Sequence, residues 1–174
     1  MTAMVLTACL LAASGGNTAH DLGVLRSSAV REKVFDAAVR VAGSGDEVAL
    51  RKLGALLASR AFLARLDDTR EPQAAYSNLH WVFQALAANP SAMTEALCLK
   101  VIASAPFVED PDRRFFALPA LAAVRPMSSE TAAVFEKANG QGSWSFNGPL
   151  LATNGSDRAL AILEAMFADH AQPR

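Results

Sequence analysis

Two acidic clusters come closest, by residue type and spacing, to catalytic or metal-binding chemistry. They are Asp67-Asp68 and Glu109-Asp110-Pro111-Asp112. Paired carboxylates can act as a general acid and base, or can supply the oxygen ligands that Ca²⁺ and Mg²⁺ prefer. Both clusters, however, flank predicted helix ends, where negative charge stabilises the helix dipole. We therefore interpret them as helix caps rather than as a catalytic or metal site.

The histidines and cysteines form no pattern typical of a metal site or a nucleophile. His20, His80 and His170 do not have metal-ligand spacing from one another or from Cys9 and Cys98. The chain also lacks a Gly-x-Ser-x-Gly elbow. We expect His80 to be a packing residue and both cysteines to remain thiols on different helical hairpins. The sequence thus predicts no catalytic residue, no metal site and no cofactor.

A glycine-rich segment at residues 139–148, with the sequence NGQGSWSFNG, is the most unusual stretch. Glycines near a helix start can hold phosphate through backbone N–H groups. No predicted strand precedes this segment, and its spacing matches neither the P-loop nor the dinucleotide fingerprint. We interpret it as a loop between helical units, anchored by Trp144 and Phe146. Contact of Trp144 with a partner is the alternative.

Trp81 is the main candidate for a partner-binding residue. The helix predicted from Pro72 to Ala88 has an apolar stripe formed by Tyr76, Leu79, Phe83 and Leu86. At about 100° per residue, Trp81 points away from this stripe, beside Asn78 and Gln84. Tryptophan is enriched at interface hot spots, so we predict that Trp81 anchors a partner, with Gln84 and Asn78 as a polar rim. The alternative is that a second helix of the fold covers Trp81.

The composition limits the class of protein in which these residues act. Of the 174 residues, 52% are hydrophobic and 19% are charged, which excludes a disordered chain. The net charge is -1, from 16 basic and 17 acidic residues. The densest basic stretch, residues 26–40, is interleaved with acidic residues and is typical of a solvated helix face. Because no basic patch is clustered, the sequence predicts no nucleic-acid partner.

Helix caps and 3.6-residue periodicity predict a succession of helices and no strand. Ser28, Asp46, Ser91, Ser128 or Ser129, and Ser156 stand at predicted N-caps. Asp110-Pro111 opens a further helix that ends before Pro126. In the last helix, the residues expected to face inward are Leu160, Leu163 and Phe167.

The N-terminal segment, residues 1–16, has two interpretations. It is apolar, ends in small residues, and resembles a signal segment with a lipoprotein-like box before Cys9. No basic residue precedes it, and it is too short to span a membrane. The alternative is a helix at residues 4–13 that belongs to the fold and lacks its partner. Such an apolar end predicts weak self-association, or a truncated array.

A repeated theme of helix, small-residue turn and new helix connects these elements. It is carried by residues 8–17, 37–46, 86–91 and 151–157. Three segments also carry a family resemblance, namely residues 45–50 (GDEVAL), 154–163 (NGSDRALAIL) and the proline-bearing 116–121 (FALPAL). These segments resemble the turns and first helices of HEAT repeats. The resemblance implies an all-α fold in which 1–174 form one α-α superhelix, a short solenoid of stacked helical hairpins.

The resemblance to HEAT repeats also implies a function. Members of this family are scaffolds that bind proteins or peptides, and they supply no catalytic residues that could be carried over to this chain. The sequence therefore predicts a non-enzymatic scaffold in the cytoplasm. Two alternatives remain. One is a HEAT-like lyase, or lyase-associated protein, that attaches chromophores. The other is an exported, periplasmic or lipid-anchored form, if residues 1–16 are a signal segment.

Overall fold

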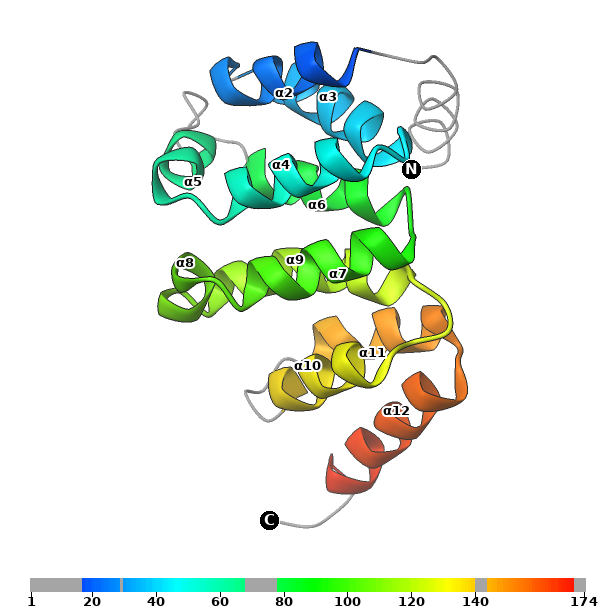
Figure 1. Cartoon of the computed structure of the whole chain (residues 1–174). Helices are drawn as coiled ribbons and strands as arrows, with labels where there is room; N and C mark the ends of the chain where they lie inside the picture. The colour runs from blue at the N-terminus through cyan, green and yellow to red at the C-terminus, as the bar shows by residue number, and fades with distance from the viewer. Residues whose placement is uncertain (1–16, 29, 68–77, 140–143, 171–174) are drawn as a thin grey trace.

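The described part of the chain is all-α, as predicted. The computed structural model describes residues 17–28, 30–67, 78–139 and 144–170, and these contain eleven helices and no strand (Figure 1). The helices are α2 (Thr18–Ser27), α3 (Arg31–Gly43), α4 (Glu47–Leu57), α5 (Arg60–Asp67), α6 (Asn78–Ala87), α7 (Ala92–Ile102), α8 (Ala105–Glu109), α9 (Asp112–Ala123), α10 (Ser129–Asn139), α11 (Trp144–Asn154) and α12 (Asp157–His170). The expected helix at residues 4–13 lies outside the described residues.

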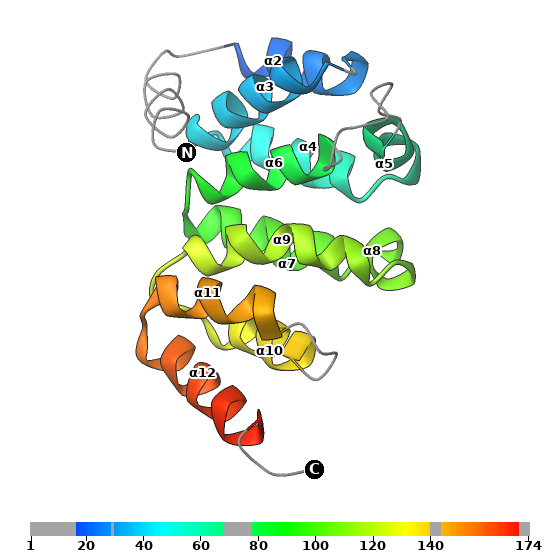
Figure 2. The same ribbon diagram turned by 180° about the vertical axis from the view of Figure 1, so that it is seen from behind.

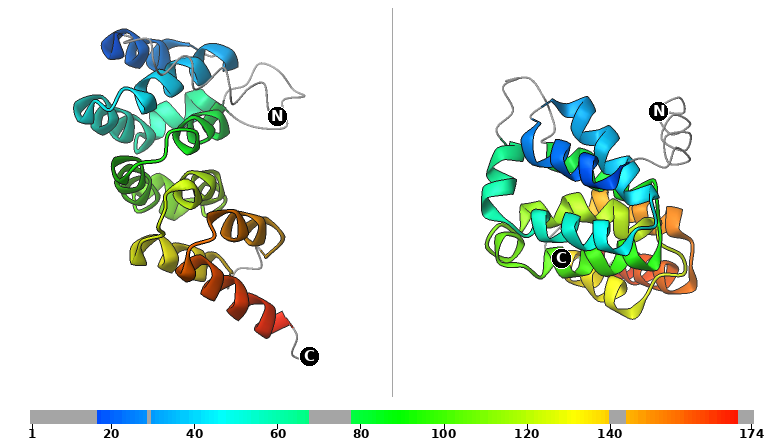
Figure 3. Two further views of the ribbon diagram at one scale, coloured as in Figure 1. Left: turned by 90° about the vertical axis from the view of Figure 1, so that its right-hand side faces the viewer. Right: turned by 45° about the horizontal axis from the view of Figure 1, so that its top comes forward.

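The longer helices pack in two layers. In the first layer α2, α4, α7, α10 and α12 each contact the next, and in the second α3, α6, α9 and α11 do the same. Figure 2 shows the second layer from its own side, and Figure 3 shows both layers from the edge. Contacts between the layers join α2 to α3, α7 to α9 and α11 to α12. Short α5 and α8 lie on the same side of the stack, at successive levels (Figure 1).

Side-chain caps explain where several helices begin. Asp46 accepts hydrogen bonds from the N–H groups of Val48 and Ala49, at 2.9 and 3.2 Å. The Ser91 hydroxyl accepts from the N–H of Thr94 at 3.0 Å. These bonds satisfy backbone donors that a helix start leaves without partners. Ser28 was expected to cap α3, but the N-cap is Val30, whose N–H donates to the Ser28 hydroxyl.

Two glycines allow tight turns between successive helical units. Gly45 and Gly155 have positive φ angles of 66° and 67°. Each directly precedes the residue at which the next helix begins its hydrogen bonding, Asp46 and Ser156. Glycine adopts this left-handed conformation without the steric cost of a Cβ atom. The repeated turn seen in the sequence is thus a repeated backbone geometry.

The core lies between the two layers and is mainly aliphatic. Its fully buried side chains include Leu53 and Leu57 of α4, Leu79 and Phe83 of α6, and Leu118 of α9. Burying each such side chain contributes about 1.5–3 kcal/mol relative to exposure. The ring of Phe83 packs edge-to-face against Phe107 of α8, with centroids 6.1 Å apart. Layer-to-layer burial of leucine and phenylalanine is therefore the main stabilising contribution.

One ion pair is almost completely buried. The Nε and Nη2 atoms of Arg40 in α3 both lie 2.9 Å from Oδ1 of Asp21 in α2. The side chain of Asp21 is 3% exposed and that of Arg40 is 24% exposed. By contrast, the Glu47–Arg51 pair spans 3.3 Å on the outside of α4, and both partners are more than 60% exposed. The two pairs therefore differ sharply in how much water surrounds them.

The predicted orientation of the last helix is right only for Leu163, which is half-buried against the core, and wrong for Leu160 and Phe167. Leu160 and Phe167 of α12 are 41% and 54% exposed, while Ala159, Ile162 and Met166 are buried. Helix α12 carries two apolar stripes. The stripe with Ala159, Ile162 and Met166 packs against α10 and α11. Periodicity alone does not distinguish the two stripes, because both repeat with helical spacing.

Candidate functional site

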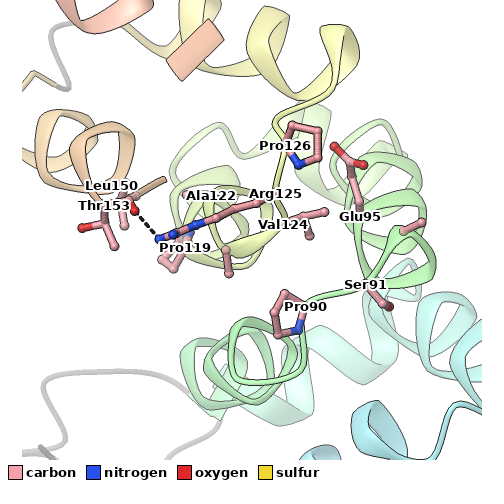
Figure 4. Close-up of a pocket in the computed structure, with 12 residues that line it drawn as sticks. Pro90, Ser91, Glu95, Pro119, Ala122, Val124, Arg125, Pro126, Leu150 and Thr153 are labelled. Carbon is pink, nitrogen blue, oxygen red and sulfur yellow. Dashed lines mark hydrogen bonds between the residues drawn. The ribbon is translucent and has the colours of Figure 1, made fainter. Parts of the chain in front are cut away.

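A cavity of about 770 Å³ lies along the edge of the stack where successive helices turn (Figure 4). We call it the turn groove. Its walls come from the α6–α7 turn, the end of α9 with the following turn, and the second half of α11. Its lining residues are Pro90, Ser91, Ala92, Glu95, Pro119, Ala122, Ala123, Val124, Arg125, Pro126, Leu150 and Thr153.

Asn154 fixes the turn that forms one wall of the groove. Its buried amide Nδ2 donates to the carbonyl oxygens of Ala122 and Val124, at 2.7 and 2.9 Å. Ala122 lies in the last turn of α9 and Val124 directly follows it, where a helix leaves carbonyl oxygens without intrahelical donors. Pro126 lacks an N–H group and cannot satisfy the carbonyl four residues before it. The side chain of Asn154 therefore replaces the missing backbone donor.

The groove carries opposite charges on two of its walls. Arg125 reaches α11, where one guanidinium nitrogen donates to the carbonyl oxygen of Thr153 (Figure 4). Glu95 on α7 accepts hydrogen bonds from the hydroxyl groups of Ser128 and Thr131, at 2.5 and 2.6 Å. These bonds hold both charged side chains in defined positions. Proline, alanine and valine side chains line the space between them.

This geometry gives stiff, mainly apolar walls that carry one positive and one negative side chain. Glu95 and Arg125 stand on different walls of the groove rather than as a contacting acid–base pair (Figure 4). The prolines at 90, 119 and 126 make the walls stiff, because each ring fixes its backbone φ angle. Such stiff walls can bind a segment of polypeptide at a low entropy cost, because their side chains are already ordered before binding. The sequence pattern used Pro126 as a helix boundary and Pro119 as part of the HEAT resemblance, and it did not predict the groove.

Comparison of the chain with protein-family models, curated proteins and solved structures gave no match.

A row of aromatic rings lies on the second layer, around the predicted residue Trp81. Trp81 of α6 packs edge-to-face against Phe35 of α3, and the neighbouring His80 packs against Phe116 of α9. The centroid distances are 5.6 and 6.1 Å. All four side chains are partly buried. The rings therefore join three successive helices while keeping part of their surface in water.

The other predicted binding residues do not gather around Trp81 as expected. Gln84 is half-buried, but Asn78 is only 1% exposed. The prediction that Asn78 forms an exposed polar rim is therefore wrong, because contacts with α3, α5 and α9 enclose α6. Trp144 is the first residue of α11, and its side chain lies outside the described residues.

Partial burial favours the neutral form of the His80 imidazole. Desolvation lowers the pKa of its imidazole, because removal from water disfavours the charged form. In the unfolded chain a histidine keeps a pKa of about 6.5. The unfolded state therefore binds the proton first as the pH falls, and native stability decreases on the acid side of that value.

We predict a measurable contribution of His80 to this acid sensitivity. Urea unfolding at about pH 7.5 and pH 5.5 should show a larger loss of stability for the natural protein than for His80→Gln, which has no titratable group at this position. Equal acid sensitivity of the His80→Gln variant and the natural protein would show that the ring stays hydrated.

In the described residues, Cys98 is shielded from reaction and belongs to no metal-binding group. Cys98 on α7 is a free, fully buried cysteine, and burial raises the pKa of its thiol far above the usual range. It is therefore unreactive as a nucleophile in the folded protein. Cys9 lies outside the described residues. Across the described ranges, no group of three His, Cys, Asp or Glu side chains could hold a metal ion.

No helix in the described part of the chain has both the length and the apolar character needed to cross a bilayer.

Proposed function

We propose that this protein is a non-enzymatic scaffold that binds an extended segment of a protein or peptide partner in the turn groove. The observation that carries the proposal is the groove itself, with a stiff apolar floor and fixed charges on Glu95 and Arg125. The two-layer packing of helical hairpins is consistent with the resemblance to HEAT repeats, whose members bind proteins and peptides. Specificity comes from the charges, which favour a segment with one acidic and one basic side chain.

A displayed library of random peptides tests this function. Selection on the purified protein should enrich peptides in which an acidic and a basic residue flank apolar residues. Arg125→Glu reverses the charge of an exposed side chain, so it should weaken binding of the selected peptides about tenfold or more through the loss of one charge-assisted contact. Circular dichroism should confirm that the variant remains helical.

The control is Arg26→Glu, which makes the same charge change on the exposed last turn of α2, outside the groove. This variant should bind the selected peptides as tightly as the natural protein. If both variants bind equally well, or if the library yields no charge pattern, the groove is not the binding surface.

Trp81 is a second proposed contact for the partner, and its truncation distinguishes a binding role from a packing role. Because the side chain is half-buried against Phe35, Trp81→Ala should cost less than the roughly 3–5 kcal/mol lost when a fully buried tryptophan is truncated. Chemical denaturation measures this loss. Trp81→Phe should restore most of the stability.

The same two variants are then tested for binding of the selected peptides. A role in recognition predicts weaker binding by Trp81→Ala at a temperature where the variant is fully folded. A loss of 3 kcal/mol or more in stability, with unchanged peptide affinity, would assign Trp81 to the core alone.

A further inference from the structure

A separate apolar cleft lies at the opposite end of the helices from the turn groove. Its cavity volume is about 360 Å³, and it is enclosed by residues of α7, α8, α9 and α10. In Figure 1 this side of the stack is marked by α8, whereas the α6–α7 and α9–α10 turns that line the turn groove lie on the other side. Leu99, Ile102, Leu118 and Val134 are among the residues that line it. We call it the α8 cleft.

Two cationic side chains also line the α8 cleft. Arg114 is in the first turns of α9 and Lys137 is in the last turn of α10. Helices α9 and α10 run in opposite directions because the turn at residues 124–128 joins them. The start of α9 and the end of α10 therefore lie on the same side of the stack (Figure 1). An apolar cavity with a few convergent charged groups is the usual form of a small-molecule site.

Among the described residues, no acidic residue lines the cleft, and two acidic residues near it are paired with other cations. Asp110 accepts a hydrogen bond from Arg113 at 2.8 Å, and Glu109 pairs with Arg60. The Nε of Arg114 donates to the carbonyl oxygen of Phe107 at 2.8 Å, which fixes the guanidinium group beside the cavity without neutralising it. The two cations of the cleft therefore produce a net positive field at its lining.

The size of the cavity limits the ligand. At about 30 Å³ per water molecule in the liquid, the α8 cleft holds roughly a dozen water-sized groups. This is enough for a short alkyl chain with a polar head and too small for a nucleotide or a large cofactor. An aliphatic lining removes such a chain from water, which contributes about 0.8 kcal/mol for each buried CH₂ group.

We propose that the α8 cleft binds a free small carboxylate with an apolar chain of roughly six to ten carbon atoms. The chain lies on the aliphatic lining, and the carboxylate accepts hydrogen bonds from Arg114 and Lys137. This site is independent of the turn groove, since the two cavities share no lining residue. Loss of peptide binding in the turn groove would therefore leave the proposal for the α8 cleft unaffected.

Titration with sodium octanoate tests the proposal, using calorimetry together with the amide chemical shifts of the purified full-length chain. Octanoate should bind at one site and shift the signals of α7, α9 and α10 around the cleft. Octylamine and octanol, which have the same chain with a positive or a neutral head, should bind at least tenfold more weakly. Equal binding of the three compounds would overturn the role given to the cations.

Lys137→Glu should weaken octanoate binding about tenfold or more, because it reverses one of the two positive charges at the site. The matched control is Lys100→Glu, the same change on an exposed lysine in the last turn of α7 that does not line the cleft. Val134→Trp provides a second test, since it fills the cavity, and it should abolish octanoate binding while the chain remains helical.

Two results contradict the proposal. One is an equal effect of Lys137→Glu and Lys100→Glu, which would indicate a general effect of net charge. The other is tighter binding of a short peptide with a free C-terminal leucine than of octanoate, with loss of this binding on amidation. That result would assign the α8 cleft to a polypeptide C-terminus instead of a free small molecule.

Discussion

Arg40→Met should destabilise the protein more than any surface substitution, because it leaves the carboxylate of Asp21 buried without its counter-ion. Breaking a buried ion pair by removing one partner costs roughly 3–5 kcal/mol, and the partial exposure of Arg40 places the expected loss toward the lower end. Chemical denaturation at neutral pH gives the value directly.

A double variant and a control variant test whether the unpaired buried charge causes this loss of stability. Adding Asp21→Leu to Arg40→Met should recover most of the stability, because the buried charge is then absent and a side chain of similar size fills its place. Arg51→Met removes an arginine from the exposed pair with Glu47, and it should cost no more than about 0.5 kcal/mol. Equal losses at positions 40 and 51 would contradict the view that burial makes the Asp21–Arg40 pair important.

Asn154→Ala should reduce stability and peptide binding together. The substitution leaves the buried carbonyl oxygens of Ala122 and Val124 without their donor. Each unsatisfied buried group costs about 1–3 kcal/mol, so a total of about 2–4 kcal/mol is expected. Because the same turn carries Val124, Arg125 and Pro126 into the turn groove, its release should also weaken binding of the selected peptides.

Thr153→Ala is the control for Asn154→Ala. The Thr153 hydroxyl is exposed and bonds only within its own helix, to the carbonyl oxygen of Pro149. Its removal should change stability by no more than about 0.5 kcal/mol. If Asn154→Ala costs as little as this control, water replaces the amide at the α9–α10 turn, and the turn does not depend on α11.

Much of the local structure follows from short-range signals in the sequence. Asp46 and Ser91 are caps as predicted, since their side chains bond to N–H groups two or three residues away. Gly45 adopts the left-handed conformation that its position before a new helix suggests. Such interactions depend on neighbouring residues only, so they can be predicted before the tertiary fold is known.

Prediction from the sequence failed where a helix has two similar apolar faces. In α12, Leu160 and Phe167 were expected inside, but the stripe with Ala159, Ile162 and Met166 is buried. The short helix α8 was also not predicted. It begins at Ala105, after a turn that follows the end of α7 at Ile102, and Pro106 stands in its first turn. In both cases packing against a neighbour selects one of two arrangements that are locally equivalent.

The sequence by itself determined an all-α chain, its main turns, and the absence of a recognised catalytic motif, since these depend on residue type and on periods of a few residues. Only the tertiary structure decided where binding could take place. The turn groove combines Glu95, Arg125 and Thr153 from three different helical units, and the α8 cleft combines Arg114 with Lys137. These residues are distant in sequence and become neighbours only because helices in each layer stack on the next, which no local pattern encodes.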